Sequence, residues 1–220
     1  MGGGAFAAAA LLTGGSSKPT ASPASCGGTA PAAASTVSQF NNKYSAPPKM
    51  TIDPSKTYVM TMQTSCGTID ITLDAKGAPN TVNSLVFLAD QHFFDGVFFH
   101  RIVPNFVIQG GDPTGTGSGG SGYTVVDDPG KGAQYPVGTL AMAKTSSEPA
   151  GTSGSQFFIV TSASAQTALA PGGVGQYAIA GHVTSGMDVV QKIAAVPVGG
   201  STGDQPQQKV YIEKVTISVR

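Results

Sequence analysis

Apolar and polar positions alternate over short stretches of this chain, and a period of two is typical of β-strands. Residues 58–64 and 68–73 alternate on either side of a turn at 65–67 and predict a hairpin. In the last strand the apolar face switches near Glu213, so we expect a β-bulge there. The remaining short apolar runs also predict strands, at residues 99–103, 106–109, 123–126, 139–143, 156–161, 177–183 and 210–219.

Two segments repeat their apolar residues every three or four positions, which predicts helices. The first starts at Pro79, with Asn80 as the expected N-cap, and ends before residues 93–96. The second follows Gly186. Their apolar stripes are Val82, Leu85, Val86 and Ala89, and Met187, Val190, Ile193 and Ala194.

These elements predict a mainly β fold. About eight strands joined by short turns favour an antiparallel sheet closed into a barrel, with two α-helices as caps. Thirty glycines and fifteen prolines agree with many turns, and 40% hydrophobic residues are enough for a core. Twelve basic and twelve acidic residues leave no basic excess, so we expect no nucleic-acid partner.

Composition divides the chain into three parts. Residues 1–15 are small and apolar, which indicates a remnant or weak form of a secretion signal or membrane anchor, or else a disordered terminus. Residues 16–50 are rich in Ser, Thr, Ala and Pro and predict a linker. Residues 51–220 form the expected domain. A tail and linker of this kind favour an extracytoplasmic protein, either secreted or tethered to a membrane.

The two cysteines, Cys26 and Cys66, could pair in an oxidising compartment and staple the linker to the domain. Cys26 could instead carry a lipid, although residues 23–25 match a lipidation signal poorly. Two Cys and three scattered His show no metal-ligand spacing, so we expect no metal. The glycine-rich stretch 110–122 lacks the Gly-Lys-Ser/Thr ending of a phosphate-binding loop, so we do not expect it to bind phosphate.

Strong hydrogen-bonding groups interrupt otherwise apolar strands at three positions. They are Arg101 and Gln109 in FHRIVPNFVIQGGD, residues 99–112, and Gln156 in GSQFFI, residues 154–159. Such groups need partners or face a wet cleft. Together with GTLAMA, residues 138–143, these motifs resemble the cyclophilins, which are peptidyl-prolyl cis-trans isomerases. The resemblance covers about 170 residues. It implies an eight-stranded barrel with a packed interior and a ligand groove on its outer wall.

Prolyl isomerisation requires rotation about an amide against a barrier of ~20 kcal/mol, with no bond made or broken. No cofactor or nucleophile is needed. A fixed cation that donates to the imide nitrogen stabilises the twisted transition state, an apolar pocket holds the proline ring, and a donor holds the carbonyl.

The resemblance assigns these roles to particular residues. It implies that Arg101 and Gln109 are catalytic, although an ordinary ion pair and a buried amide would also fit the residue types. Substrate-binding positions are implied at Phe106, Val107, Gly117, Ala143, Lys144, Gln156, Phe158, Leu169 and Tyr177. The apolar members of this set would equally fit plain barrel core.

Several positions depart from the family pattern. Val107 replaces a common Met, Lys144 and Thr145 replace Asn and Ala, and the loop that follows is about three residues longer. The chain has no Trp; Ala168 or a neighbour stands where several eukaryotic members carry the tryptophan that contacts cyclosporin. Tyr177 replaces a common His. We therefore expect isomerase activity with weak or no cyclosporin binding.

The remaining polar groups suggest no second chemistry. His100 must face away from Arg101 on its strand, and we expect a hydrogen-bonded core histidine. His92 and His182 are expected to face solvent. No hydrolase motif is present. The expected partners are proline-containing peptides and unfolded proteins, and the expected state is a monomer. A proline-peptide binding module or chaperone with little turnover is the alternative function.

Overall fold

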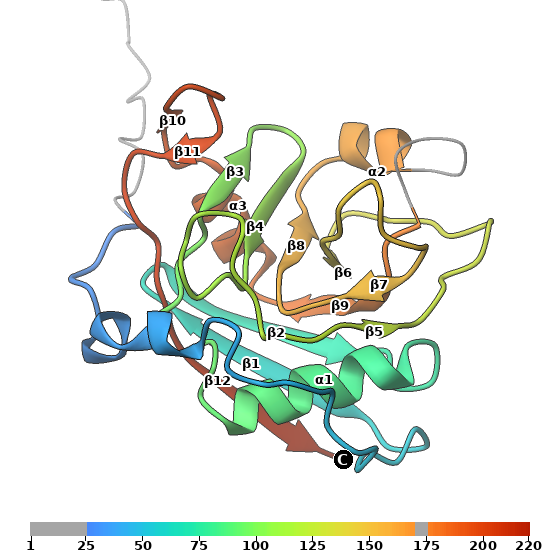
Figure 1. Ribbon diagram of the computed structural model, residues 1–220. Coiled ribbons are helices and arrows are strands. Elements are labelled where there is room, and N and C mark those ends of the chain that lie inside the picture. The colour runs from blue at the N-terminus through green and yellow to red at the C-terminus, as the bar shows by residue number, and fades with distance from the viewer. Residues whose placement is uncertain (1–25, 170–175) are drawn as a thin grey trace, which may run out of the picture.

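The structure is a computed structural model that describes residues 26–169 and 176–220 (Figure 1). The expected apolar tail, residues 1–15, and the first part of the expected linker lie outside the described residues. None of the helices in the described ranges is long and apolar enough to cross a bilayer.

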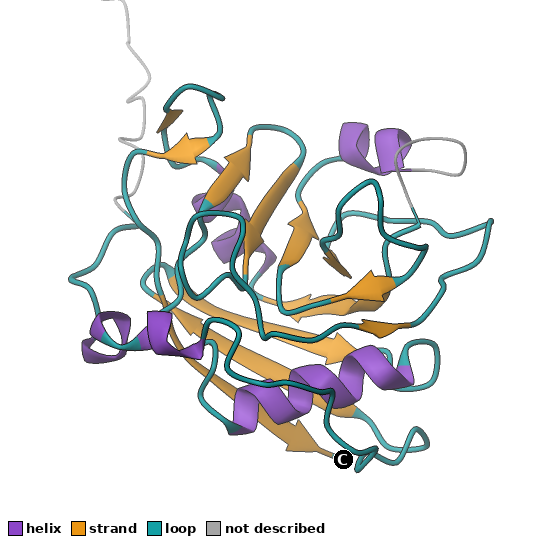
Figure 2. Cartoon of the chain, in the orientation of Figure 1, coloured by secondary structure: helices purple, strands orange, loops and turns teal. Residues whose placement is uncertain are grey.

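The fold is built on one eight-stranded antiparallel sheet that curls around an apolar interior (Figure 2). This confirms the mainly β prediction and most of the expected strands. The order across the sheet is β12 (Ile212–Val219), β1 (Tyr58–Thr64), β2 (Gly67–Leu73), β9 (Ile179–Ser185), β6 (Thr139–Met142), β8 (Phe157–Val160), β4 (Val107–Gly110) and β3 (Arg101–Val103).

The two edge strands of the sheet, β12 and β3, approach each other but do not pair. The segments just before β3 and β12 meet in a single bridge between Phe98 and Tyr211. Backbone hydrogen bonds flank that bridge, from Phe99 N to Val210 O at 3.0 Å and from Ile212 N to Val97 O at 2.7 Å. The sheet is therefore a curled, partly open barrel, in place of the fully closed barrel expected.

The expected bulge at Glu213 is confirmed. Gln63 of β1 faces Lys214, whereas the next residue, Thr64, faces Ile212, so Glu213 has no opposite partner. The extra residue lets the apolar positions on both sides of it face the interior.

Two smaller pairs of strands lie outside the main sheet. β5 (Val125–Val126) pairs with β7 (Thr152–Ser153), and β10 (Val198–Gly199) pairs with β11 (Gln205–Pro206). The strand predicted at 123–126 is therefore real only in its second half, and it does not belong to the main sheet.

Two of the three α-helices in the described part of the chain were predicted. α1 (Pro79–Asp90) packs against β12, and α3 (Met187–Ala194) packs against β2 and β4. Asn80 is not the N-cap of α1: the helix begins after Ala78, with Pro79 in its first turn. The carboxylate of Asp127, far along the chain, accepts hydrogen bonds from the backbone N–H groups of Asn80 and Thr81 at 3.4 and 2.6 Å. A tertiary contact thus supplies the cap.

The third helix, α2 (Ala163–Leu169), was not predicted. Its sequence, ASAQTAL, lacks an apolar stripe, but the Ser162 hydroxyl accepts a hydrogen bond from Ala165 N at 3.3 Å, as an N-cap does. Ala165 and Leu169 face inward and attach the helix to the sheet.

Residues 26–50 differ from the free linker expected for residues 16–50, because they pack along the domain. Two short 3₁₀ turns, η1 (Ala32–Ser35) and η2 (Val37–Phe40), place Val37 in the core and the Phe40 ring 5.7 Å from the Phe93 ring. Composition alone predicted a linker because this segment has few apolar residues. Those few pack against residues that lie elsewhere in the sequence, and composition does not reveal such contacts.

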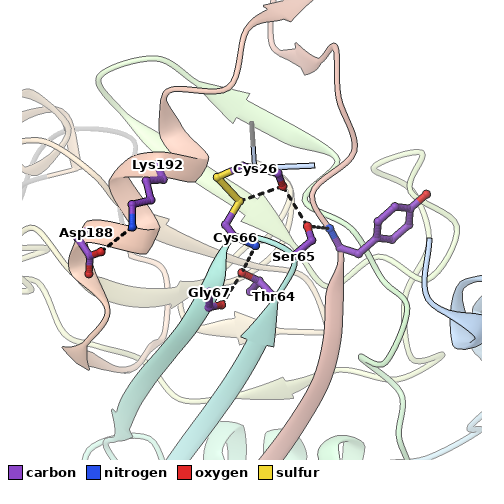
Figure 3. The surroundings of a disulfide bond; sticks show 8 residues. Cys26, Thr64, Ser65, Cys66, Gly67, Asp188 and Lys192 are labelled. Carbon is purple, nitrogen blue, oxygen red and sulfur yellow. Dashed lines mark hydrogen bonds and ion pairs between the residues drawn. A yellow bond between two sulfur atoms is a disulfide. The ribbon is translucent and has the colours of Figure 1, made fainter. Parts of the chain in front are cut away.

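A disulfide between Cys26 and Cys66 fixes the start of this segment (Figure 3). Cys66 lies in the turn between β1 and β2, next to Ser65. The Ser65 hydroxyl donates to Cys26 O and accepts a hydrogen bond from Tyr211 N, both at 3.1 Å. The pairing that the sequence left open is therefore present.

Candidate active site

Strand register places three of the predicted site residues in one row on the outer face of the sheet. Arg101 of β3 lies opposite Gln109 of β4, and Gln109 lies opposite Phe158 of β8. Phe158 in turn lies opposite Ala141 of β6. Because alternate residues of a strand share a face, their neighbours Ile102, Ile108, Ile159 and Leu140 point into the core.

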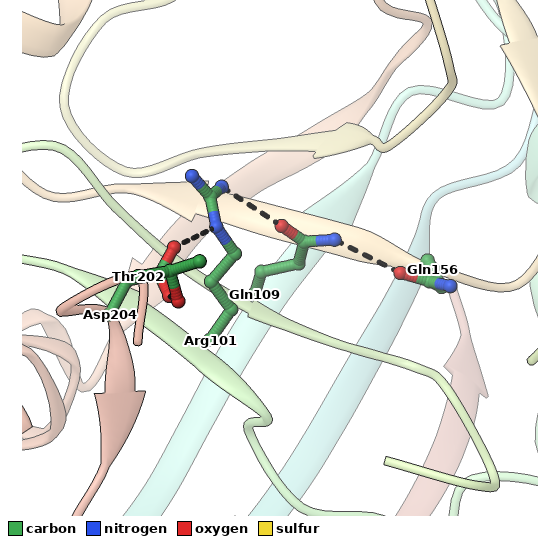
Figure 4. Close-up of polar contacts among 5 residues, drawn as sticks. All are labelled: Arg101, Gln109, Gln156, Thr202 and Asp204. Carbon is green, nitrogen blue, oxygen red and sulfur yellow. Dashed lines mark hydrogen bonds and ion pairs between the residues drawn. The ribbon is translucent and has the colours of Figure 1, made fainter. Parts of the chain in front are cut away.

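The polar members of the site form a continuous hydrogen-bonded chain (Figure 4). Arg101 Nη1 donates to Gln109 Oε1 at 3.3 Å, and Gln109 Nε2 donates to Gln156 Oε1 at 3.0 Å. Gln156 Nε2 then donates to the carbonyls of Gly117 and Gly119, both at 2.9 Å. The partners that the sequence required for these three groups are thus mainly one another.

A carboxylate that the sequence analysis missed holds the other side of the guanidinium. Arg101 Nε donates to Asp204 Oδ2 at 2.7 Å, in a pair whose side chains are 43% and 19% exposed. The hydroxyl of Thr202 donates to the other carboxylate oxygen. These bonds, from Thr202 and then Arg101, lower the pKa of Asp204. The available signal was weak: Asp204 is the sole charged residue between positions 195 and 208.

Phe158 of this row and apolar side chains from neighbouring positions line a cavity of about 140 Å³. Since a water molecule occupies ~30 Å³ of liquid, this space accepts a small ring but no large side chain. Phe158 and Leu169 are buried in its wall, and the Tyr177 ring meets the Phe158 ring edge-on at 5.1 Å. The lining residues are Arg101, Phe106, Val107, Gln109, Ala143, Lys144, Phe158, Leu169 and Tyr177.

The structure therefore brings together nine of the eleven predicted site residues around one cavity. The other two, Gly117 and Gln156, line an adjoining and more polar cavity of about 700 Å³, which Gln109, Ala143 and Lys144 also border. The outward-facing apolar residues are not part of the main core, which was the other interpretation of their spacing. They form a separate cluster on the outer wall, here called the outer-wall cluster: Val107, Tyr135, Ala141, Phe158, Val160, Ala165 and Leu169.

Tyr135 of the outer-wall cluster also escaped the sequence analysis. Its hydroxyl donates to Tyr177 O and accepts from Tyr177 N, both at 2.9 Å, and so fixes the backbone of a cavity-lining residue. Burial raises the pKa of this hydroxyl, so it stays protonated and can donate at neutral pH. The residue lies in a loop, where no periodicity marks a buried side chain.

His100 is buried, as predicted, but it is not hydrogen-bonded as predicted. It is 8% exposed, and neither of its ring nitrogens has a hydrogen-bond partner among the described residues. Burial lowers the pKa of His100, opposed by the Asp112 carboxylate, so the ring is neutral at pH 7. His92 and His182 face solvent, as expected. Within residues 26–169 and 176–220, no group of three or more His, Cys, Asp or Glu could hold a metal ion.

Comparison with known proteins agrees with this geometry. Residues 59–217 match the family model described as cyclophilin type peptidyl-prolyl cis-trans isomerase. Peptidyl-prolyl cis-trans isomerase B of Streptomyces anulatus is 37% identical over 179 residues, which cover 73% of this chain and 96% of that protein. Peptidyl-prolyl cis-trans isomerase-like 1 of Gibberella zeae is 36% identical over 160 residues, which cover 71% and 92%.

A similar solved structure was determined in the presence of a proline-containing dipeptide. The cyclophilin type isomerase of Cryptosporidium parvum, crystallised in the presence of the dipeptide Ala-Pro, superposes with a TM-score of 0.63 at 29% identity. The match covers 73% of this chain and 98% of that chain. The family model and the relatives agree in the region that carries Arg101, Gln109 and Phe158, and this chain belongs to the cyclophilin-type peptidyl-prolyl cis-trans isomerase family.

Proposed function

We propose that this chain catalyses cis-trans rotation about X-Pro bonds in polypeptides without covalent chemistry, and that Arg101 is its main catalytic group. One observation carries the proposal: the Arg101 guanidinium lies at the wall of a small apolar cavity that Phe106, Phe158 and Leu169 also line. A proline ring in that cavity would have its imide nitrogen within reach of a fixed cation.

The reaction gains from such a cation because the twisted amide has lost its resonance. Its nitrogen then carries a localised lone pair that accepts a hydrogen bond, whereas the planar nitrogen accepts none. An N–H donor fixed beside it stabilises the transition state more than either ground state, which is the condition for catalysis.

The surroundings of Arg101 suit that task. Asp204 holds Nε and Gln109 holds Nη1, so the guanidinium is fixed at two of its five N–H groups and can present another to a substrate. Gln109 also borders the cavity, where its amide can hold the carbonyl of the rotating bond. An arginine keeps its charge throughout the physiological pH range.

The test is the replacement of Arg101 in an exchange assay on an Ala-Pro peptide, followed by NMR or a coupled protease. Arg101→Ala should lower kcat/KM by at least ~10², which corresponds to about 3 kcal/mol. Arg101→Lys keeps the charge but loses the planar fork and should recover only part of the activity. Equal activity in wild type and Arg101→Ala would remove Arg101 from the mechanism.

The same assay separates catalysis from simple peptide binding. A binding module or chaperone with little turnover would need the cavity but not Arg101, and its peptide would show binding without exchange. Hydrogen bonds run without a break from Asp204 through Arg101 and Gln109 to Gln156, and this arrangement favours an enzyme over a binding module.

We also propose that the natural substrates are proline-containing segments of unfolded or flexible proteins, and that the chain acts as a monomer. Cyclosporin should bind weakly, because the chain has no tryptophan to contact it and Ala168, at the end of α2, is small and exposed. Titration calorimetry tests this expectation, and a nanomolar Kd would contradict it.

The Cys26–Cys66 disulfide supports an extracytoplasmic location, because such bonds persist in oxidising compartments. Trapping free thiols in intact cells and in separated fractions would test the location. Recovery of the chain with both cysteines reduced in a cytoplasmic fraction would count against it.

A further inference from the structure

The segment of residues 26–50 lies outside the region that matches the family model, residues 59–217, yet it reaches the candidate active site. It is held to the domain at several points. Cys26 is bonded to Cys66, and Phe40 packs against the core. At the far end, Asn83 of α1 accepts hydrogen bonds from Thr51 N at 2.9 Å and donates to Lys49 O at 3.0 Å.

Between these anchors the segment forms hydrogen bonds with the glycine-rich loop. Asn41 Oδ1 accepts from Gly120 N at 3.0 Å, and Asn42 N donates to Gly120 O at 2.9 Å. Tyr44 N donates to Ser121 O at 3.0 Å. The fit is close, because a Cβ on Gly122 would lie 2.3 Å from Tyr44 O, so no side chain is possible there.

The opposite side of the same loop is held by the site itself. Gln156 donates to Gly117 O and Gly119 O, and Asp112 accepts from Gly117 N at 2.7 Å and from Gly119 N at 3.0 Å. The loop is thus fixed between Gln156 and Asp112 on one side and residues 41–44 on the other. Its glycines have few backbone restrictions of their own, so these contacts determine its position.

Asn42 also borders the 700 Å³ cavity. This cavity adjoins the 140 Å³ cavity lined by Phe106, Phe158 and Leu169, here called the proline cavity. The φ of Asn42, 53°, is in the left-handed region, which Asn adopts more readily than most residues. The other charged or amide side chains of the 700 Å³ cavity are Gln109, Gln156, Lys144 and Glu148. A carboxamide here can both donate and accept hydrogen bonds.

We propose that residues 41–44 are a working part of the substrate groove, an inference that rests on the proposed function. Asn41 positions the glycine-rich loop, and the Asn42 carboxamide contacts polar side chains or backbone of the residues that flank the proline. The substrate class is then an extended peptide with polar residues around its proline. Each extended residue adds ~3.3 Å, so the residues that flank the proline reach the 700 Å³ cavity. A bare dipeptide does not.

The experiment uses the full chain with its disulfide intact and compares four variants. Asn41→Ala removes the acceptor for Gly120 N, whereas Asn41→Asp keeps it. Asn42→Gly removes the side chain but tolerates the positive φ. Gln39→Ala is the matched control, because Gln39 is exposed on the same segment and does not border either cavity. The probes are Ala-Pro itself and a six-residue peptide with Ala-Pro at its centre and asparagine on either side.

Asn41→Ala and Asn42→Gly should each raise KM for the six-residue peptide about fivefold, the equivalent of one lost hydrogen bond, with kcat unchanged. The Kd of Ala-Pro should stay the same in both, and Asn41→Asp should restore the wild-type KM. A purely structural role would not produce this split between the two probes.

The inference is overturned if both variants match Gln39→Ala on the six-residue peptide, or if they weaken Ala-Pro binding equally. Should Asn41→Ala fail to fold, Asn42→Gly alone decides. Failure of the proposed function is distinguishable, because calorimetric affinities for the two probes can be compared even if the wild type shows no turnover.

Discussion

The two faces of β4, β6 and β8 come from the same short strands but serve different ends. On the inner face Ile108, Ile159 and Leu140 lie opposite one another in one row and are sealed from solvent. On the outer face the next row holds Gln109, Phe158 and Ala141, with Arg101 beyond Gln109. One period-two rule therefore builds both the core and the site. The outer row differs because polar groups interrupt it, and each of them has a specific partner.

Truncating the inner face should have the largest effect on stability and little on chemistry. Ile159 is 0% exposed, so Ile159→Ala should lower the free energy of unfolding by about 4 kcal/mol through lost contacts and a residual cavity. Urea unfolding measures the loss. The kcat of the folded fraction should remain within about twofold of wild type; a much larger fall would mean that the two faces are not separable.

Truncating a side chain on the outer face should affect both stability and substrate binding. Phe158→Ala should cost about 3 kcal/mol of unfolding free energy and raise KM for an Ala-Pro peptide roughly tenfold, because Phe158 packs in the outer-wall cluster and also lines the proline cavity. Unfolding curves and exchange kinetics on the same samples measure the two effects.

Val160 provides the control for that experiment. It lies on the same face of β8 and in the same outer-wall cluster, but it does not border the proline cavity. Val160→Ala should lower stability by about 2 kcal/mol and leave KM unchanged. A KM that rises equally in both variants would assign the change at position 158 to general loosening of the wall.

The sequence predicts those features of the two faces that depend on residues close together in the chain. Alternation within a strand fixes which residues share a face, so the outward placement of Arg101 and Gln109 and the bulge at Glu213 could be predicted. The family resemblance then supplied the identities of all nine residues around the proline cavity.

The missed features depend on residues that are distant in sequence. Asp204 reaches Arg101 across 103 positions, and Asp127 caps α1 across 46. The packing of residues 26–50 depends on a disulfide that spans 40 positions and on Asn83. None of these contacts leaves a local periodicity, because each is set by where the folded sheet places two separate loops.

The smallest predicted effect concerns the pair that joins the outer row to the β10–β11 hairpin. Asp204→Asn keeps the shape of the side chain but removes its charge, and it should lower kcat about fivefold, since a partly exposed ion pair contributes about 1 kcal/mol. Asp188→Asn is the control, because Asp188 pairs with Lys192 on α3, away from the row, and should leave kcat unchanged. Adding Asp204→Asn to Arg101→Ala should cost nothing further if Asp204 acts only by positioning Arg101.

The pH dependence of the same variant sharpens the test. The pKa of Asp204 is lower in the folded chain than its ordinary value near ~3.9, so its charged form contributes above that value and the contribution is lost as the pH falls through the folded pKa. The ratio of wild-type to Asp204→Asn activity should therefore stay constant from about pH 8 to pH 5 and begin to fall only near or below about pH 4. His100 should add no step near pH 6.5, because burial lowers its pKa as well. A ratio that already collapses near pH 6 would show that another titrating group, and not the Asp204 carboxylate, holds Arg101 in place.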